Sequence, residues 1–154
     1  MKREDVLRNI FEVEDKIKRL RICSELGLAG PMEIGILSVI SESGGKLKVS
    51  EISNRINSTM PNVSRALKSM EKEGKILRTV DDNDRRNTMV TITEDGKRYL
   101  NENLWAISRF MASALSRLSI EDLENYSNLL GKIYSAYRRE LCGGENTEKG
   151  GINV

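Results

Sequence analysis

The sequence of 154 residues contains no histidine, only two cysteines and two prolines, and few aromatic residues, which make up 5% of the chain. Without histidine, the Ser-His-Asp and Cys-His forms of nucleophilic catalysis lack their general base. A structural zinc site normally needs four Cys or His ligands, so a zinc site is not expected. No Walker loop and no Gly-x-Gly-x-x-Gly pattern is present. The sequence therefore predicts a protein that is not an enzyme and that needs no cofactor.

The chain also lacks a long hydrophobic run. No stretch of about 18 apolar residues occurs, so we expect no membrane span. Acidic residues are spread through the N-terminal segment, which lacks the apolar centre of a signal peptide. With 38% hydrophobic and 31% charged residues, the composition is typical of a soluble, helix-rich domain. These features predict a cytoplasmic protein that makes no contact with a membrane.

An excess of charge of one sign is also missing, because the formal net charge is only +2. The positive charge is concentrated between residues 46 and 98, which hold 12 Lys and Arg against 8 Asp and Glu, a net +4. The rest of the chain has a net charge of −2. A surface that faces phosphate groups needs such a local excess, so this distribution supports a nucleic-acid partner for the central segment.

Apolar residues recur at helical spacing on both sides of the central segment. Before it, the pattern predicts one long helix over about 4–26 and a second over about 32–43. After it, capping residues and apolar stripes predict helices over about 93–118 and 119–141. Residues 142–154 are Gly-rich and polar, so we expect a flexible tail there.

The central segment combines short helices with a hairpin. The pattern predicts a strand at 46–48, a helix at 49–56, a three-residue turn, a helix at 60–73, and strands at 76–80 and 88–92. Pro61 fits the first turn of the second of these helices, and Gly74 fits the position just after its end. The expected fold class is therefore mainly α with a small β wing, in the form of a winged helix-turn-helix lobe.

The helix at 60–73 divides into an apolar and a polar side. Val63, Leu67 and Met70 share one stripe, with Ala66, which predicts burial against a core. Asn62, Ser64, Arg65 and Lys68 occupy the remaining surface. In the major groove, Asn pairs with adenine and Arg with guanine, while Ser and Lys reach phosphates or base edges. The alternative is an ordinary solvated helix face, but the turn and the hairpin favour DNA binding.

The hairpin tip has the sequence DDNDRRN, and its aspartates would repel phosphate. Asn and Asp are good turn formers, so this tip is expected to turn and to direct Arg85 and Arg86 outward. An arginine of this kind is suited to a narrow minor groove. One of the aspartates is expected to pair with one of these arginines, or with Arg65, and so to hold the angle of the wing. The alternative is an ordinary polar hairpin with a charged tip.

These residues resemble the MarR family, the multiple-antibiotic-resistance type of bacterial winged-helix regulators. The matching motifs are VSEISNRI, NVSRALKSMEKEG, ILRTV, the D-x-R of Asp84 and Arg86, and the T-x-x-G of Thr93 to Gly96. They occur in the family's order and spacing, and the similarity extends over about residues 1–141. Lys48 departs from the pattern, because the family often has a helix-capping Thr or Ser there. GPMEIGIL also departs from it, in place of the common leucine-threonine opening of the second helix.

The resemblance implies a homodimer that binds a palindromic operator, with dimerisation helices in 1–30 and 97–141 around a DNA-binding lobe at 32–96. It implies a transcriptional repressor released by a small, often aromatic, effector. By position, the residues at the major groove would be Ser58, Thr59, Pro61, Asn62, Ser64, Arg65 and Lys68. Arg86, with Arg85, would enter the minor groove, and Asp84 would position the wing. The alternative function is a winged-helix protein-interaction module without DNA binding.

The dimer also follows from the apolar stripes, which a single small lobe cannot cover. The alternative is a monomer in which the long helices pack on one another. Six residues of the helices are candidates for an effector cavity, although their periodicity favours plain core: Phe11, Tyr99, Trp105, Phe110, Met111 and Tyr126. Cys23 is either an oxidant sensor or an inert thiol, and the sequence favours the inert thiol because no histidine lies near it and Arg21 is the nearest basic residue. Cys142 borders the tail and has no predicted role.

Overall fold

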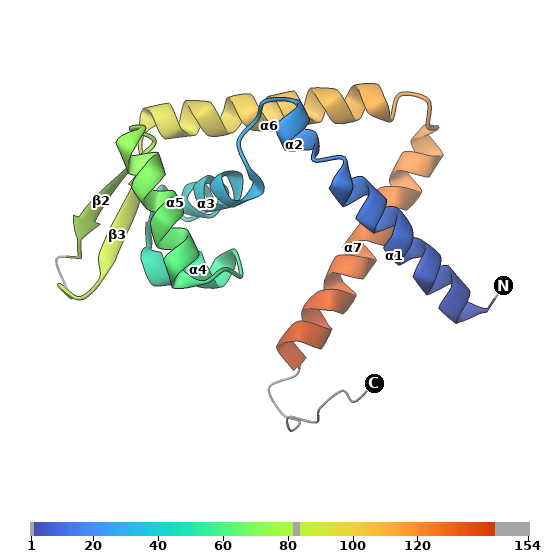
Figure 1. Ribbon diagram of the computed structural model, residues 1–154, viewed down its shortest axis with the longest axis horizontal. Coiled ribbons are helices and arrows are strands. Elements are labelled where there is room, and N and C mark those ends of the chain that lie inside the picture. The colour runs from blue at the N-terminus through green and yellow to red at the C-terminus, as the bar shows by residue number, and fades with distance from the viewer. Residues whose placement is uncertain (1, 82–83, 144–154) are drawn as a thin grey trace. The chain divides into compact units, whose positions relative to one another are not determined.

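The protein is described by a computed structural model covering residues 2–81 and 84–143 (Figure 1). In chain order its elements are α1 (Arg3–Arg19), α2 (Ile22–Glu25), α3 (Pro31–Glu42), β1 (Lys46–Lys48), α4 (Val49–Arg55), α5 (Met60–Lys72), β2 (Ile76–Val80), β3 (Thr88–Ile92), α6 (Glu94–Ala114) and α7 (Ile120–Gly143). The chain forms two compact units, divided within α6 between Phe110 and Met111. No helix of the described residues is long and apolar enough to cross a membrane. The predicted fold class, mainly α with a small β wing, is confirmed.

The three strands form an antiparallel sheet in the order β1-β3-β2. Its inner side packs with α3, α4 and α5 around one core in the first unit. The predicted apolar stripe of α5 is confirmed, because Val63, Leu67 and Met70 are at most 1% exposed. Burial of each such side chain contributes about 1.5–3 kcal/mol. This packing fixes the side of α5 that faces the core and leaves its polar side at the surface.

The predicted single helix over 4–26 is wrong, because α1 ends at Arg19 and a separate short helix, α2, follows. Between them Arg21 has φ of 47°, a left-handed conformation that costs a non-glycine residue about 1–2 kcal/mol. A contact distant in sequence accompanies the break. The N–H of buried Ala29 donates to Oδ1 of Asn103 on α6, over 2.8 Å. The change of direction allows this segment to reach α6, which a local helical pattern cannot predict.

The start of α6 is held closely against the turn between α5 and β2. Thr93 caps the helix, since the N–H of Gly96 donates to its Oγ1 over 3.0 Å. The Thr93 hydroxyl also donates to the carbonyl oxygen of Gly74, and its N–H to that of Lys75. At Gly96 a side chain would have no room, because a Cβ would lie 2.0 Å from the carbonyl oxygen of Lys75. The glycine of the T-x-x-G motif therefore permits this approach.

The Lys75 side chain joins three helices of the lobe. Its Nζ lies 2.6 Å from a carboxylate oxygen of Glu33 on α3 and 2.6 Å from one of Glu73 after α5. The same ammonium lies 3.6 Å from the ring centroid of Tyr99 on α6. Burial by itself would lower the pKa of Lys75, but hydrogen bonding to Glu33, Glu73 and Tyr99 outweighs it and raises that pKa well above its usual range. The ammonium therefore stays charged and ties these helices together.

Candidate nucleic-acid interface

The turn between α4 and α5 is pinned by its own backbone. Asn57 adopts φ of 50°, a left-handed conformation that Asn tolerates. The N–H of Ser58 donates to the carbonyl oxygen of Ser53 over 3.0 Å, and the Ser53 hydroxyl donates back to the carbonyl oxygen of Ser58 over 2.5 Å. These contacts set the angle at which α5 leaves the turn.

The residues predicted for the major groove form one surface of α5 and the turn before it. Pro61, Asn62, Ser64, Arg65 and Lys68 are exposed on α5, Thr59 is exposed at its start, and Ser58 is half-buried. Thr59 occupies the N-cap position of α5, but its side chain makes no capping hydrogen bond. The backbone of the turn already sets the start of the helix, so α5 does not need that bond.

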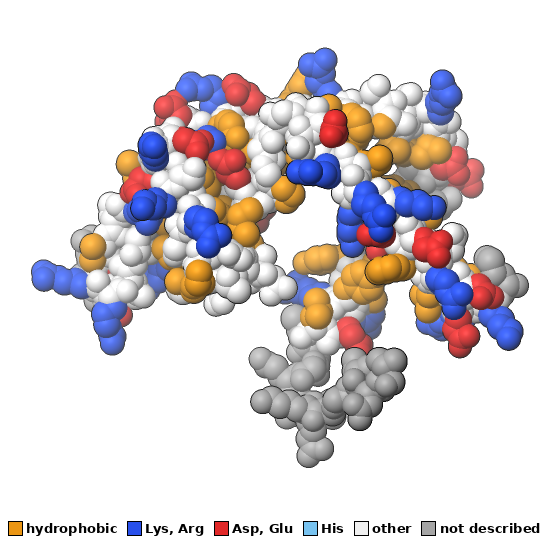
Figure 2. Space-filling model, viewed as in Figure 1, with side chains coloured by type: hydrophobic (Ala, Val, Ile, Leu, Met, Phe, Trp, Pro, Cys, Tyr) orange, Lys and Arg blue, Asp and Glu red, His pale blue; other side chains and the backbone are white. Residues whose placement is uncertain are grey.

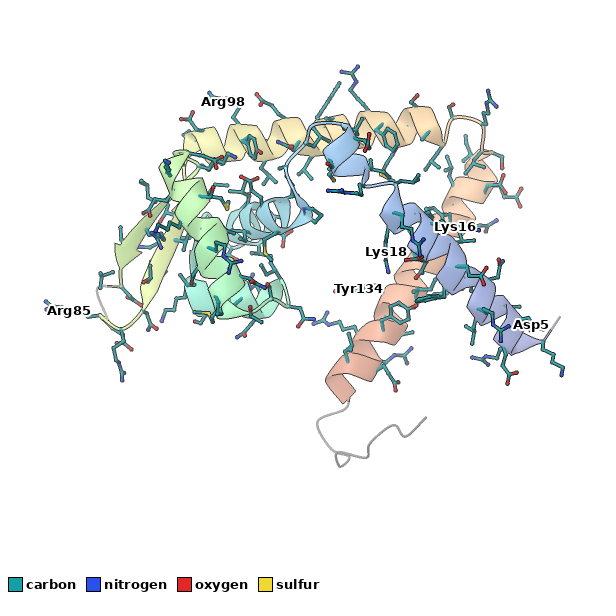
Figure 3. All side chains as sticks on the ribbon, in the orientation of Figure 1. Asp5, Lys16, Lys18, Arg85, Arg98 and Tyr134 are labelled. Atoms are coloured by element: carbon teal, nitrogen blue, oxygen red, sulfur yellow. The ribbon has the colours of Figure 1, made fainter. Side chains whose placement is uncertain are left out.

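At the wing tip, Asp84 binds Arg86, one of the two arginines of the tip. The Asp84 carboxylate accepts from Nε of Arg86 over 3.1 Å and from the Arg86 backbone N–H over 3.1 Å. Hydrogen bonds from Arg86 hold the pKa of Asp84 below its ordinary value. The Arg86 side chain remains 90% exposed, and Arg85 projects from the tip, away from the lobe (Figure 3). The predicted pairing of an aspartate with an arginine is confirmed, while Asp82 and Asn83 lie outside the described residues.

The remaining aspartate of the tip is turned inward. The Asp81 side chain is only 9% exposed, and its Oδ2 lies 3.3 Å from Nζ of Lys48 at the end of β1. A second ion pair joins α5 to the wing, because Nη2 of Arg78 lies 2.5 Å from Oε2 of Glu71. Hydrogen bonding from Arg78 lowers the pKa of Glu71 below its ordinary value. Both acidic groups are therefore paired with a basic side chain.

Two hollows accompany this surface. A cavity of about 190 Å³ separates the start of α5 from the wing, and its lining includes Lys48, Met60, Ser64, Arg78 and Arg86. A shallower hollow of about 440 Å³ lies along the turn and is lined only by hydroxyl and amide side chains: Ser53, Asn54, Asn57, Ser58, Thr59 and Asn62. Such groups donate and accept hydrogen bonds without imposing a charge. Both hollows lie on the same side as the exposed set of α5.

Sequence reasoning missed three residues of this surface. Met60 is 45% exposed at the first position of α5, and its place immediately before Pro61 could have suggested it. Lys48 and Arg78 contribute through ion pairs with residues on other elements. Nothing local marks such pairs in the sequence, because they depend on the strand order and on the packing of α5.

A third cavity, of about 650 Å³, lies where α1, α2 and α3 adjoin. Its lining combines apolar Ile17, Ile22 and Leu28 with basic Lys18 and Arg21. Cys23, a free thiol, also lines it, whereas the side chain of Cys142 lies outside the described residues.

Most of the six residues considered for an effector cavity are exposed. Phe11 and Trp105 are 68% and 67% exposed, and Met111 and Tyr126 are exposed as well. Only Tyr99 and Phe110 are half-buried, and Tyr99 packs against the core. The four exposed residues are therefore not part of the core cluster of the lobe.

The central part of the chain matches a known family. Residues 31–88 fit the family model described as MarR. This range runs from α3 through the turn and α5 to the first residue of β3, so it contains the surface described above. Over these residues the chain has the winged helix of the MarR family of transcriptional regulators. The predicted family is confirmed over these residues, and they fit a family of transcriptional regulators rather than of enzymes.

Other comparisons extend the similarity beyond residues 31–88. The transcriptional repressor MprA of Escherichia coli K12 is 26% identical over 117 residues, which cover 76% of this chain and 66%, just under two thirds, of MprA. A MarR family protein from Bacillus stearothermophilus has a similar fold, with a TM-score of 0.76, 20% identity, and coverage of 90% and 99% of the two chains. The organohalide-sensing regulator RdhR-CbdbA1625, in its 2,4-dichlorophenol-bound form, has a TM-score of 0.71, 21% identity, and coverage of 100% and 92%.

Proposed function

We propose that this protein is a dimeric, cytoplasmic transcriptional repressor that binds a palindromic DNA operator and is released by a small-molecule effector. The observation that carries the proposal is the polar surface of α5, which lies on one side of the lobe together with the arginines of the wing. A helix and a basic hairpin arranged in this way fit a major groove and the minor groove beside it.

Each residue of this surface has a role that its chemistry suits. Asn62 and Arg65 have the side chains that pair with adenine and guanine in the major groove. Lys68 and the hydroxyl groups of Ser58, Thr59 and Ser64 suit phosphates or base edges, and Pro61 shapes the start of α5. Arg86, held by Asp84, would enter the minor groove with Arg85 beside it.

The dimer is proposed because two helices expose their apolar stripes. No residue of α1 is buried, and none of the side chains described for α7 is buried. Exposed apolar residues of α7 include Leu129 at 56%, Tyr134 at 65% and Tyr137 at 59%, and hydrophobic side chains on this helix are open to view (Figure 2). Soluble proteins rarely expose such continuous patches, so a second copy is the simplest cover.

The proposed domain plan keeps the dimerisation helices in 1–30 and 97–141 and the DNA-binding lobe in 32–96. Residues 144–154 of the proposed flexible tail lie outside the described residues, and α7 extends through Gly143.

The proposed effector site is the cavity where α1, α2 and α3 adjoin. Its apolar lining favours an aromatic or other hydrophobic molecule, and Lys18 and Arg21 favour a negatively charged group on it. The structure of RdhR-CbdbA1625 with 2,4-dichlorophenol offers a precedent among proteins of this fold. The lining belongs to the segment that joins α1 to the DNA-binding lobe. A molecule bound there would therefore change the spacing of the two lobes in the proposed dimer.

The test is a selection of bound fragments from genomic DNA, followed by affinity measurements on the enriched duplex. A repressor of this kind enriches a palindrome whose half-sites lie roughly one helical turn apart. A protein-interaction module without DNA binding, which is the alternative function, enriches none.

Arg65→Ala should then weaken binding by about 1–3 kcal/mol and relax the preference at one base position. Arg98→Ala is the matched control, since Arg98 is an exposed arginine on α6 that pairs locally with Asp95 (Figure 3). If Arg65→Ala bound the duplex as tightly as Arg98→Ala, the proposed orientation of α5 would be wrong.

A further inference from the structure

An ion pair crosses the base of the wing. Lys48 is the last residue of β1, and its Nζ lies 3.3 Å from Oδ2 of Asp81, the residue that follows β2. We propose that this pair positions the wing for DNA readout, with Lys48 and Asp81 as positioning residues that act through Arg86. The inference rests on the proposed function, because it requires that the wing meets DNA.

The strand order gives the pair its reach. β3 is the central strand, with Met89 opposite Lys48 on one side and opposite Thr79 on the other. Neighbouring strands lie about 4.8 Å apart, so the backbones of β1 and β2 are separated by about 10 Å. Side chains alternate along a strand, which places Asp81 on the same face as Thr79 and Lys48. The Lys48 side chain therefore spans the central strand and reaches the far strand where it ends.

The wing needs support at this point. β1 pairs with β3 only over Lys46–Lys48, opposite Met89–Thr91. Beyond Met89 the hairpin has two strands, β2 and β3, and a two-stranded hairpin alone is marginally stable in water. The ion pair links the end of β1 to Asp81, where the tip begins, and so supports the hairpin beyond the three-stranded part of the sheet.

A series of hydrogen bonds leads from Asp81 to the arginine. The N–H of Asp81 donates to the carbonyl oxygen of Asn87 over 3.0 Å, and the N–H of Asn87 donates to that of Asp84 over 2.8 Å. The carboxylate of Asp84 then accepts from the side chain and the backbone of Arg86. Because the Arg86 side chain is 90% exposed, its direction depends mainly on this series. A shift of Asp81 is therefore transmitted to Arg86.

Charge and burial agree with this role. The Asp81 side chain is 9% exposed, and a carboxylate so far removed from water is costly unless a cation accompanies it. Lys48 supplies that cation, with a side chain that is 39% exposed. The negative charge of Asp81 is then held away from a phosphate backbone.

A competing explanation for a role of Lys48 in DNA binding is direct contact with a phosphate. The two explanations predict opposite effects for a substitution at Asp81. If Lys48 touched phosphate, Asp81→Asn would remove a nearby negative charge and would leave binding unchanged or make it tighter. If the pair positions the wing, Asp81→Asn should weaken binding in spite of the favourable change in charge.

The first arm of the test uses the free full-length protein and amide hydrogen exchange followed by NMR. Lys48→Met keeps the length of the side chain and removes its charge, and Asp81→Asn removes the charge of the partner. Each variant should speed exchange of the Asp81 and Asn87 amides by about twofold to fivefold. Lys97→Met is the matched control, since Lys97 pairs with Glu94 at the start of α6. Unchanged exchange at the tip in both wing variants would overturn the proposal.

The second arm uses the selected duplex with A·T or G·C flanks. Lys48→Met and Asp81→Asn should each reduce the ratio of the affinity for A·T flanks to that for G·C flanks by about twofold to fivefold. Lys48→Arg keeps the positive charge and should keep the wild-type ratio. Adding Lys48→Met to Arg86→Ala should cause no further loss of the ratio. Tighter binding by Asp81→Asn with an unchanged ratio would overturn the proposal in favour of a phosphate contact. If the wild type enriches no palindrome, the proposed function fails, and the exchange measurement still reports separately on the ion pair.

Discussion

Replacement of Gly96 with Ala should destabilise the lobe, although alanine is the better helix former. A Cβ at this position would lie 2.0 Å from the carbonyl oxygen of Lys75, about 1 Å inside the 3.0 Å limit of real Cβ contacts. The obstacle is backbone, so α6 must move away from the turn between α5 and β2. That movement strains the hydrogen bonds from Thr93 to Gly74 and to Lys75.

The size of the effect follows from three contributions. Overpacking costs about 1–3 kcal/mol, and each weakened hydrogen bond about 1 kcal/mol. The higher helix propensity of alanine relative to glycine offsets about 1 kcal/mol of this loss. We expect a net loss of about 2–4 kcal/mol, which lowers the Tm of a chain of this size by roughly 4–16 °C.

The assay is urea and thermal unfolding of the full chain followed by circular dichroism. Gly35→Ala is the matched control, because Gly35 is a helical glycine of the same lobe whose added Cβ would lie 3.7 Å from Ile56, an ordinary contact. That variant should be neutral or more stable by up to about 1 kcal/mol. If Gly96→Ala proved as stable as Gly35→Ala, the close approach of α6 to the turn would be refuted.

Three further predictions concern other parts of the first unit. Asn103→Ala leaves a buried backbone amide without its acceptor and should cost about 1–3 kcal/mol in urea unfolding, whereas exposed Asn101→Ala should change stability by at most about 0.5 kcal/mol. Hydrogen bonding to Lys75 lowers the pKa of Glu73 in the folded protein. The ionised Glu73 therefore stabilises the fold fully above pH 4.5, its ordinary pKa, and this stabilisation is lost as the pH falls through the lowered pKa. Glu73→Gln should make the free energy of unfolding less dependent on pH in this acid range. Arg86→Ala should weaken operator binding by about 1–3 kcal/mol and blunt the preference for A·T flanks, and an unchanged preference would remove the wing from the minor groove.

The sequence by itself determined the elements of the lobe and the polar side of α5. The strands at 46–48, 76–80 and 88–92 and the helix beginning at Met60 are found where their patterns predict them. Periodicity carries this information because burial of one side of an element imposes a spacing of 2 or 3.6 residues on its own sequence. The same reasoning identified Asn62 and Arg65, since a residue outside the apolar stripe must face another direction.

Only the tertiary structure decided the features that join distant parts of the chain. The break at Arg21 accompanies a hydrogen bond between Ala29 and Asn103, which are far apart in sequence. Asp81 turns inward beside Lys48, which lies on the opposite edge strand of the sheet. The sequence alone suggests that an aspartate in a charged hairpin tip is exposed, because its partner Lys48 is brought near only when the three strands assemble. Local patterns therefore predict which side chains can face DNA, whereas long-range contacts decide how they are held.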